Sequence, residues 1–139
     1  MSGYNTNLAA EFHVLSILHR LGAAANLTLG NKKGVDIVVV REAGDAVTVE
    51  VKGVAKRYDW PADNIQSAFP RRHFVALVSF EGRIAEATFA PRCWVVPFPK
   101  LKRYLRQYKG RCNVSRAAVV KRGQQFENAW SLIIDGPPG

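Results

Sequence analysis

Two acidic side chains and one basic side chain lie on neighbouring segments whose pattern is typical of β-strands. Glu50 and Lys52 are two residues apart in the segment 46–52, where valines alternate with polar residues, so both should project from one face. Asp36 begins another segment rich in β-branched residues, and thirteen residues separate it from Glu50. A hairpin between the two segments would bring the two carboxylates together.

Two carboxylates and a backbone carbonyl form the kind of all-oxygen site that Mg²⁺ or Mn²⁺ prefers. Asp36 and Glu50 would supply the carboxylates, and Val51 the carbonyl. Such an ion polarises a phosphoryl group and lowers the pKa of a bound water. Lys52 could orient or deprotonate that water and offset charge on a pentavalent phosphorus. The alternative is an ordinary solvated strand face with an aspartate in a turn.

A helix is expected to precede the strands and to add a third carboxylate. Asn5 or Asn7 can cap this helix, and Gly22 can end it just after Leu21. Its apolar stripe at helical spacing comprises Leu8, Phe12, Leu15 and Leu18. Glu11 falls inside that stripe, where a carboxylate is costly unless something pairs with it.

The rest of the chain combines apolar strand patterns with helical ones. Strands are expected at 24–29, 35–41, 73–80 and 93–96, a loop with a helical turn around 63–69 at 53–72, a helix at 97–109, a weak helix at 115–125 and a closing amphipathic strand at 126–134. This order predicts an α/β fold class, with a central mixed sheet flanked by helices.

The pattern resembles the PD-(D/E)XK nuclease superfamily, which has the restriction-endonuclease-like fold. The matching residues are Gly34-Val35-Asp36 and Glu50-Val51-Lys52-Gly53, preceded by the helix that carries Glu11. Val35 stands where a proline names the motif. The resemblance implies that Asp36 and Glu50 bind the metal ion, that Lys52 is the catalytic lysine and that Glu11 assists.

Within that superfamily the chain looks most similar to small Holliday-junction-resolvase-like and intron- or restriction-associated nucleases. The resemblance therefore implies a Mg²⁺-dependent endonuclease that hydrolyses phosphodiester bonds, in DNA more than in RNA. Many members of the superfamily cut two strands as dimers, so a homodimer is a reasonable expectation. The alternative is a non-catalytic nucleic-acid-binding module on the same fold.

The charge of the chain makes a polyanion its expected partner. The 139 residues include 20 Lys and Arg and 11 Asp and Glu, for a net charge of +9. The excess lies in the segment 97–139, which has nine basic and two acidic residues, against eleven and nine in 1–96. We expect a single domain over 1–139, with the basic segment packed on the core. An acidic protein partner is a further alternative.

Several other classes of protein are excluded by composition. The hydrophobic fraction of 47% is too high for a disordered chain. The most apolar N-terminal stretch, 8–21, contains charged residues and is too short to span a bilayer, so we expect a cytoplasmic protein without a membrane partner. Cys93 and Cys112 are too few for a disulfide mini-protein, and neither has a partner at zinc spacing.

Nine side chains are candidate contacts with nucleic acid, and each could instead be an ordinary surface or core residue. They are Lys32, Lys33, Trp60, Gln66, Arg71, Arg72, Lys102, Arg103 and Arg106. The lysines and arginines would contact phosphates. Trp60 follows the strand that carries Glu50 and is expected to stack on bases.

Overall fold

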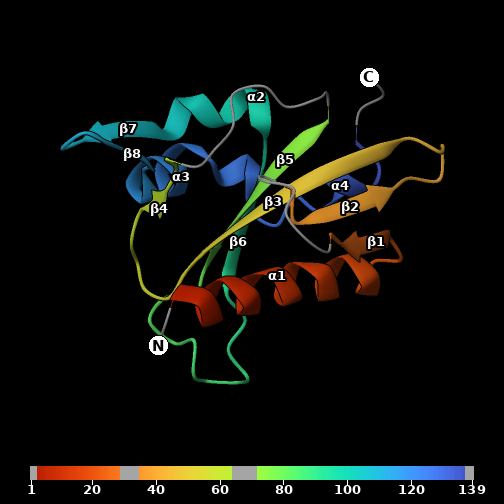
Figure 1. The fold of residues 1–139 in the computed structure, drawn as a ribbon, viewed down its shortest axis with the longest axis horizontal. Helices are drawn as coiled ribbons and strands as arrows, with labels where there is room; N and C mark the ends of the chain where they lie inside the picture. The colour runs from red at the N-terminus through yellow and green to blue at the C-terminus, as the bar shows by residue number, and fades with distance from the viewer. Residues whose placement is uncertain (1–2, 29–34, 64–71, 137–139) are drawn as a thin grey trace.

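A five-stranded mixed β-sheet forms the centre of the computed structural model, which describes residues 3–28, 35–63 and 72–136 (Figure 1). In pairing order the strands are β1 (Ala24–Leu27), β2 (Ile37–Val40), β3 (Ala46–Val54), β5 (His73–Ser79) and β6 (Arg92–Pro97). The β3–β5 pair is parallel, and the other neighbours are antiparallel. The predicted α/β class, with a mixed central sheet flanked by helices, is confirmed.

The hairpin of β2 and β3 joins the two segments that were expected to pair. Ile37 lies opposite Val49, and Val40 lies opposite Ala46. The turn between the strands contains Gly44 with a φ of 93°, a conformation that glycine adopts without steric cost. The ladder extends one residue beyond β2, because the Asp36 N–H donates to the Val49 carbonyl oxygen at 2.9 Å. Asp36 is therefore held beside the middle of β3.

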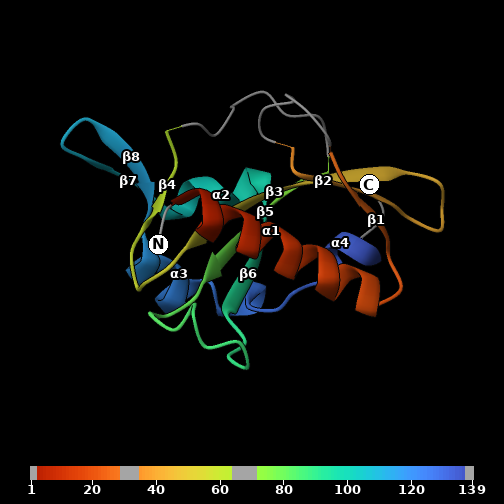
Figure 2. The ribbon, with the colours of Figure 1, turned by 60° about the horizontal axis from the view of Figure 1, so that its bottom comes forward.

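Helix α1 (Gly3–Arg20) covers one face of the sheet, and Figure 2 shows it lying across the strands. Its buried apolar residues are Ala10, Val14 and Leu18, four residues apart. The predicted stripe was wrong at Phe12, whose side chain is 54% exposed. The small Ala10 faces the sheet instead, because Gly53 of β3 lets the helix approach closely: a Cβ atom on Gly53 would meet the Ala10 Cβ at 2.6 Å.

Two apolar cores lie on opposite faces of the sheet, because alternate residues of a strand point in opposite directions. In β5, Phe74, Ala76 and Val78 join the first core with α1, whereas Val75 and Leu77 join the second core. The whole of β5 is buried, as expected for a central strand covered on both faces. Both cores thus depend on the same strand.

The segment 97–109 corrects the predicted single helix. Helix α2 (Phe98–Leu101) ends after one turn, a 3₁₀ turn (η1, Lys102–Tyr104) follows, and the chain then forms the hairpin of β7 (Leu105–Tyr108) and β8 (Arg111–Val114). Lys109 and Gly110 make the turn with φ values of 50° and 76°. Two consecutive residues with positive φ favour a tight hairpin over a continuing helix. Leu101 and Tyr104 do enter the second core, as their spacing indicated.

A second, three-stranded sheet is built on this hairpin. The short strand β4 (Trp60–Pro61) pairs with β8, in the order β4-β8-β7. Residues 64–71, which include most of the helical turn predicted around 63–69, lie outside the described residues.

The C-terminal region packs as short helices. Ser115 caps α3 (Arg116–Arg122) by accepting a hydrogen bond from the Ala118 N–H, and a 3₁₀ turn (η2, Gln124–Phe126) and α4 (Ser131–Ile134) follow. The closing strand predicted at 126–134 was wrong: one isolated bridge, between Trp94 and Glu127, is formed there. Ile133 of α4 is fully buried in the first core. The apolar residues of this segment are therefore buried by helix packing and not by strand pairing.

None of the helices in the described part of the chain is both long and apolar enough to cross a membrane.

Candidate active site

Glu50 and Lys52 project from the same face of β3, as the alternation predicted. The Lys52 Nζ lies 3.0 Å from the Glu50 Oε2. The Glu50 side chain is 5% exposed and that of Lys52 is 21% exposed, so the ammonium reaches the surface and the carboxylate does not. The second carboxylate oxygen, Oε1, is buried and accepts no hydrogen bond from the described residues. A buried anionic oxygen without a donor is costly, unless a cation occupies the space beside it.

Asp36 is fixed at the point where β2 begins. The Thr28 hydroxyl donates to the Val35 carbonyl oxygen at 2.6 Å, and the Thr28 N–H donates to the Asp36 carbonyl oxygen at 2.9 Å. The side chain crosses to β3, where its Oδ2 accepts a hydrogen bond from the Val51 N–H at 2.7 Å. Asp36 thus reaches the strand that carries Glu50, by a bond between side chain and backbone.

The Val51 carbonyl faces the same side of β3 as its N–H, because both groups of a strand residue point the same way. It therefore faces the side on which Asp36 lies, at the place where β2 no longer accompanies β3. The predicted grouping of Asp36, Glu50 and Val51 is compatible with this arrangement.

The charges around Asp36 are unbalanced. Burial raises the pKa of the Asp36 carboxyl, and the hydrogen bond from the Val51 N–H lowers it. The Glu50 charge raises this pKa further, whereas Lys52 and His73 lower it. The net result is a raised pKa. Burial also raises the pKa of the Glu11 carboxyl, and the Asp36 charge raises it further. Glu11 is thus electrostatically coupled to Asp36, although α1 covers the opposite face of the sheet from Glu50.

His73 is a buried neighbour of Glu50, and the sequence did not predict this position for it. It is 2% exposed, its Nδ1 lies 2.7 Å from the Thr48 hydroxyl, and its Nε2 lies 3.8 Å from the Glu50 Oε1. The Phe98 ring of α2 packs edge-on against the imidazole. The signal that could have found His73 is the parallel register of β3 and β5, which pairs Thr48 with His73 and which the sequence alone does not provide.

The predicted dication would have few protein ligands here and would have to keep some of its water. In residues 3–28, 35–63 and 72–136, no group of three or more His, Cys, Asp and Glu side chains is arranged to hold a metal ion. Magnesium, however, is commonly bound by one or two carboxylates, with waters and phosphate oxygens as the other ligands. The Asp36 carboxylate couples to Glu50 and to Glu11, and the Glu50 Oε1, 3.8 Å from the His73 Nε2, accepts no hydrogen bond from the described residues.

Trp60 is not available to nucleic acid, which corrects the prediction that it stacks on bases. Its side chain is completely buried, its Nε1 donates to the Val78 carbonyl oxygen at 3.0 Å, and its ring packs edge-on against Trp94. The Trp60 ring packs in the second core rather than at the surface, because burying an aromatic ring is strongly favourable.

The other predicted nucleic-acid contacts fall into three groups. Lys102, Arg103 and Arg106 are exposed near the β7–β8 hairpin. Arg72 is half-buried and forms an ion pair with Asp45, so its guanidinium is already engaged. The remaining candidates, Lys32, Lys33, Gln66 and Arg71, lie outside the described residues.

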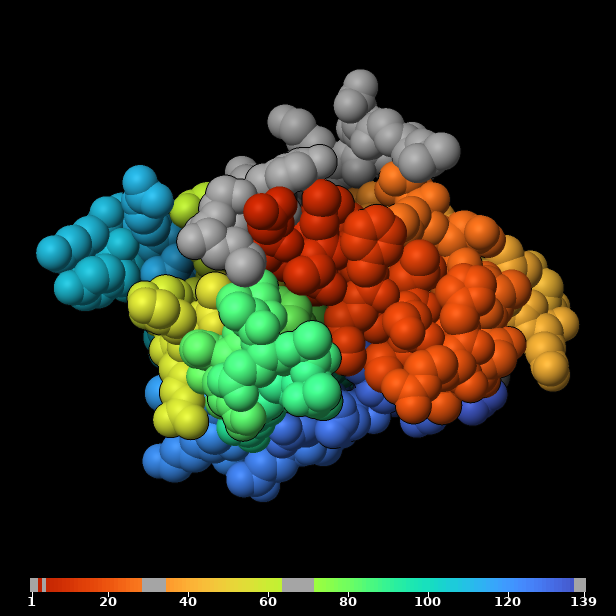
Figure 3. All heavy atoms as spheres, turned by 90° about the horizontal axis from the view of Figure 1, so that it is seen from below, coloured from red at the N-terminus to blue at the C-terminus, as the bar shows by residue number. Residues whose placement is uncertain are grey.

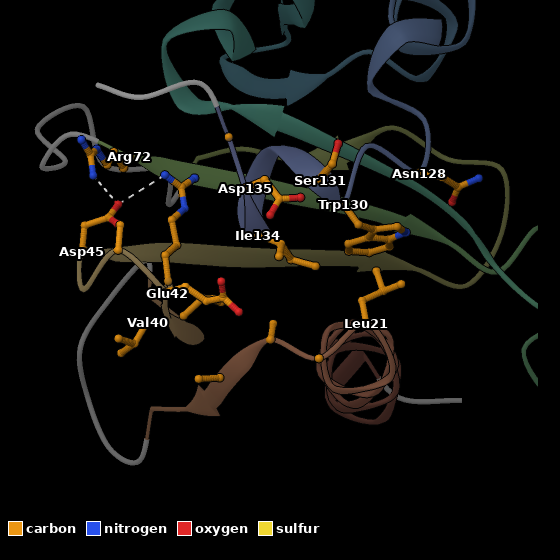
Figure 4. Close-up of a pocket in the computed structure, with 17 residues that line it drawn as sticks. Leu21, Val40, Glu42, Asp45, Arg72, Asn128, Trp130, Ser131, Ile134 and Asp135 are labelled. Carbon is orange, nitrogen blue, oxygen red and sulfur yellow. Dashed lines mark hydrogen bonds and ion pairs between the residues drawn. The ribbon is translucent and has the colours of Figure 1, made fainter.

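A pocket of about 1030 Å³ lies elsewhere, between the end of α1, the β2–β3 turn and α4 (Figure 4). Trp130, Ile134 and Leu21 form part of its wall, and none of Asp36, Glu50 and Lys52 lines it. The Arg41 guanidinium in this wall donates to the Ile133 and Leu132 carbonyl oxygens at 2.8 Å. This guanidinium therefore holds α4 in place, and the predicted site residues Asp36, Glu50 and Lys52 do not lie in the pocket.

Comparison with known proteins gives a likeness to a solved nuclease structure. No protein-family model and no curated protein matches the chain. Among solved structures, the chain is similar to the bacterial homing endonuclease I-Ssp6803I, with a TM-score of 0.60 and 17% sequence identity, over 96% of this chain and 91% of that chain. At this identity the likeness establishes the fold. A fold shared with a nuclease is thereby confirmed, and membership of the PD-(D/E)XK superfamily stays a prediction.

Proposed function

We propose that this protein is a metal-dependent endonuclease that hydrolyses phosphodiester bonds in nucleic acid, DNA rather than RNA. The observation that carries the proposal is the buried Glu50 carboxylate, which has one oxygen on Lys52, the other without a hydrogen bond from the described residues and 3.8 Å from the His73 Nε2, and a charge that couples to Asp36. The same arrangement lies on a fold that is shared with a homing endonuclease. The net charge of +9 suits a polyanionic substrate.

Each residue has a role that its position allows. Asp36, Glu50 and the Val51 carbonyl would hold Mg²⁺ or Mn²⁺, with Glu11 as an accessory carboxylate. When bound, such an ion would polarise the phosphoryl group of the substrate and lower the pKa of a bound water. The Lys52 Nζ lies 3.0 Å from the Glu50 Oε2, and we assign it to orienting the attacking water and offsetting charge on phosphorus.

Substrate contacts and assembly complete the proposal. Lys102, Arg103 and Arg106 are exposed and would contact the phosphate backbone. Two chains with one site each could cut the two strands of a duplex together, so we propose that the active form is a homodimer.

The test is nicking of supercoiled plasmid DNA with Mg²⁺, with Mn²⁺ and with EDTA. Asp36→Ala and Lys52→Ala should each lower the cleavage rate by about 10²–10⁴-fold, because each removes a group that acts at the reacting phosphate. The matched controls are Glu42→Ala and Lys56→Ala, which remove an exposed acid and an exposed base outside the site and should leave the rate unchanged. DNA binding in EDTA should persist in all four variants.

A wild-type protein that binds DNA and cuts no duplex, single strand, flap or junction with either ion would contradict the proposal. That result would establish the non-catalytic nucleic-acid-binding module instead. If no DNA bound even at low salt, the acidic protein partner would become the better account, since phosphate attraction is strongest there.

A further inference from the structure

The β7–β8 hairpin stands out from the body of the molecule. In Figures 1 and 2 it extends past β4 and α3 at one end of the molecule, and the space-filling view of Figure 3 shows it projecting from the body. Its root is anchored, because Pro61 of β4 pairs with Asn113, the Ala62 N–H donates to the Cys112 carbonyl oxygen, and the Asp63 Oδ1 accepts from the Cys112 N–H, both at 2.9 Å. The hairpin is a short ribbon on a fixed base.

The two faces of this ribbon differ in chemistry. Leu105 pairs with Val114, and both contact the second core, so this face serves packing. The next pair along, Arg106 with Asn113, lies on the opposite face, and alternation places the Tyr108–Arg111 pair there too. Arg106, Tyr108 and Arg111 are exposed, and Tyr108 is 64% exposed. The outer face thus offers two guanidiniums, a phenol and an amide.

The charge on and beside the hairpin is uncompensated. Residues 88–126 contain no acidic residue, and the basic residues from 100 to 111 are Lys100, Lys102, Arg103, Arg106, Lys109 and Arg111. None of these six forms an ion pair within the described parts of the chain, whereas Arg41, Arg83 and Arg92 are each paired with a carboxylate. The Arg106 Nη1 donates to the Leu105 carbonyl oxygen at 2.8 Å and to the Arg103 carbonyl oxygen at 3.3 Å, and its Nε and Nη2 remain able to donate.

We propose that the β7–β8 hairpin enters the major groove of duplex DNA, with Arg106, Tyr108, Arg111 and Asn113 facing the bases and phosphates. This inference deepens the proposed function and rests on it for the identity of the partner. The major groove, about 12 Å wide, admits a two-stranded ribbon, and arginine and asparagine are the side chains that pair with guanine and adenine edges. Such a ribbon would hold the duplex while the carboxylates of the site act on one strand.

Binding is measured in EDTA, so that cleavage plays no part, by fluorescence anisotropy of a labelled duplex at several salt concentrations. Arg106→Gln/Arg111→Gln should weaken binding at least tenfold and lower the slope of log affinity against log salt by about one to two. The control, Arg20→Gln/Lys121→Gln, loses the same charge at two exposed positions, one of them at the end of α1 away from the hairpin (Figure 1). It should retain both the affinity and the slope.

The groove is tested with a duplex whose cytosines carry glucosylated 5-hydroxymethyl groups, which fill the major groove. The wild type should bind this duplex at least tenfold more weakly than the unmodified one, and the hairpin variant should discriminate little between them. Duplex RNA, whose major groove is too narrow for side chains, should also bind weakly. Equal wild-type affinity for the three duplexes, or equal loss of affinity in the hairpin and control variants, would overturn the inference.

The two proposals fail in different ways. If the wild type cuts DNA and the hairpin variant binds as tightly as the control, the groove inference is wrong and the nuclease stands. If the wild type never cuts but the hairpin variant loses affinity as described, the nuclease is wrong and the groove-binding hairpin stands. Unchanged thermal unfolding of the hairpin variant is the check on its fold, and it is expected because both replaced side chains are exposed.

Discussion

At the scale of single residues, the candidate site is a set of groups that repel one another. The Asp36 charge couples to Glu50 and to Glu11, and the pKa of both Asp36 and Glu11 is raised, first by burial and then by the charge of a neighbouring carboxylate. Lys52 pairs with one oxygen of one carboxylate. Such a site reduces the stability of the metal-free protein, because raised carboxyl pKa values mean that ionisation opposes folding.

Asp36→Asn should therefore stabilise the metal-free protein at neutral pH. The amide oxygen can still accept the Val51 hydrogen bond, while the buried charge is removed. The gain should be about 1 kcal/mol, or roughly 3–5 °C in melting temperature, measured by calorimetry in EDTA. Because the folded pKa of Asp36 is raised, the gain should be full at neutral pH and shrink as pH falls toward the ordinary value of 3.8.

Magnesium should make the wild type more stable than the Asp36→Asn variant, the reverse of the order expected in EDTA. At a Mg²⁺ concentration 100 times the dissociation constant, the free energy of unfolding of the wild type should increase by about 2.7 kcal/mol, and its melting temperature should rise accordingly. The melting temperature of Asp36→Asn should not change. A wild type that does not respond to Mg²⁺ or Mn²⁺, or an Asp36→Asn variant less stable than the wild type in EDTA, would contradict the metal assignment.

The positions of Asp36, Glu50 and Lys52 were predictable from sequence because strand alternation and a short hairpin are local features. Glu50 and Lys52 share a face by the two-residue period alone, and the hairpin then places Asp36 beside Val51. His73 was not predictable, since its place beside Glu50 depends on which strand pairs in parallel with β3. The burial of Trp60 likewise depends on the second sheet, whose strands are distant in sequence.

At the scale of elements, the close approach of α1 to β3 determines where Glu11 can lie. Gly53 has no side chain at the contact, and a Cβ atom there would come within 2.6 Å of the Ala10 Cβ and 3.3 Å of the Thr6 carbonyl oxygen. Glu11 follows Ala10 directly, so any outward shift of the helix moves this carboxylate too. Glycine in a strand interior commonly marks such an approach.

Gly53→Ala should destabilise the protein by about 1–3 kcal/mol, because the added methyl group overpacks the contact. Ala10→Gly alone should cost about 1 kcal/mol through its helix propensity. Measured by urea unfolding, the loss of stability in the double variant should be smaller than the sum of the two single losses, by about 0.5 kcal/mol or more. Strictly additive effects would show that the helix does not press on β3 at Gly53.

The same elements show where sequence patterns mislead. Phe12 and Leu8 suggested a stripe of large residues, but the face that meets the sheet is the one with the small Ala10. In 97–109 the helical spacing of Leu101 and Tyr104 was real, and it covered one turn and a 3₁₀ turn before Lys109 and Gly110 reversed the chain. A short amphipathic pattern does not distinguish these conformations, because tertiary packing decides between them.

At the scale of the whole molecule, one sheet supports two cores. The first core contains α1 and Cys93, and the second contains Trp60 and Trp94. Cys93 and Trp94 are adjacent in β6 and point to opposite faces, so each reports on a different core. Burial raises the pKa of the Cys93 thiol to about 12, so it should not react with a thiol reagent at pH 8 while the fold is intact.

The two cores should therefore unfold together. One probe is the reactivity of Cys93 in a Cys112→Ser background, and the other is the tryptophan fluorescence of a Trp130→Phe variant. Both should give the same urea midpoint of unfolding, since β5 contributes buried residues to both cores. The native protein should expose no reactive thiol in that background. Midpoints that differ between the two probes would indicate that the second core and its hairpin unfold as a separate unit.

The pairing of β4 with β8 also constrains the order in which the chain can fold. Trp60 leaves the ribosome early, but its β-partner Val114 is among the last strand residues to be made. The β7–β8 ribbon closes locally and quickly, whereas its attachment must wait for a long-range encounter, the kind of contact that slows folding. A nascent chain that stops short of Val114 would thus carry an unsheltered indole, and it would be a natural client for chaperones.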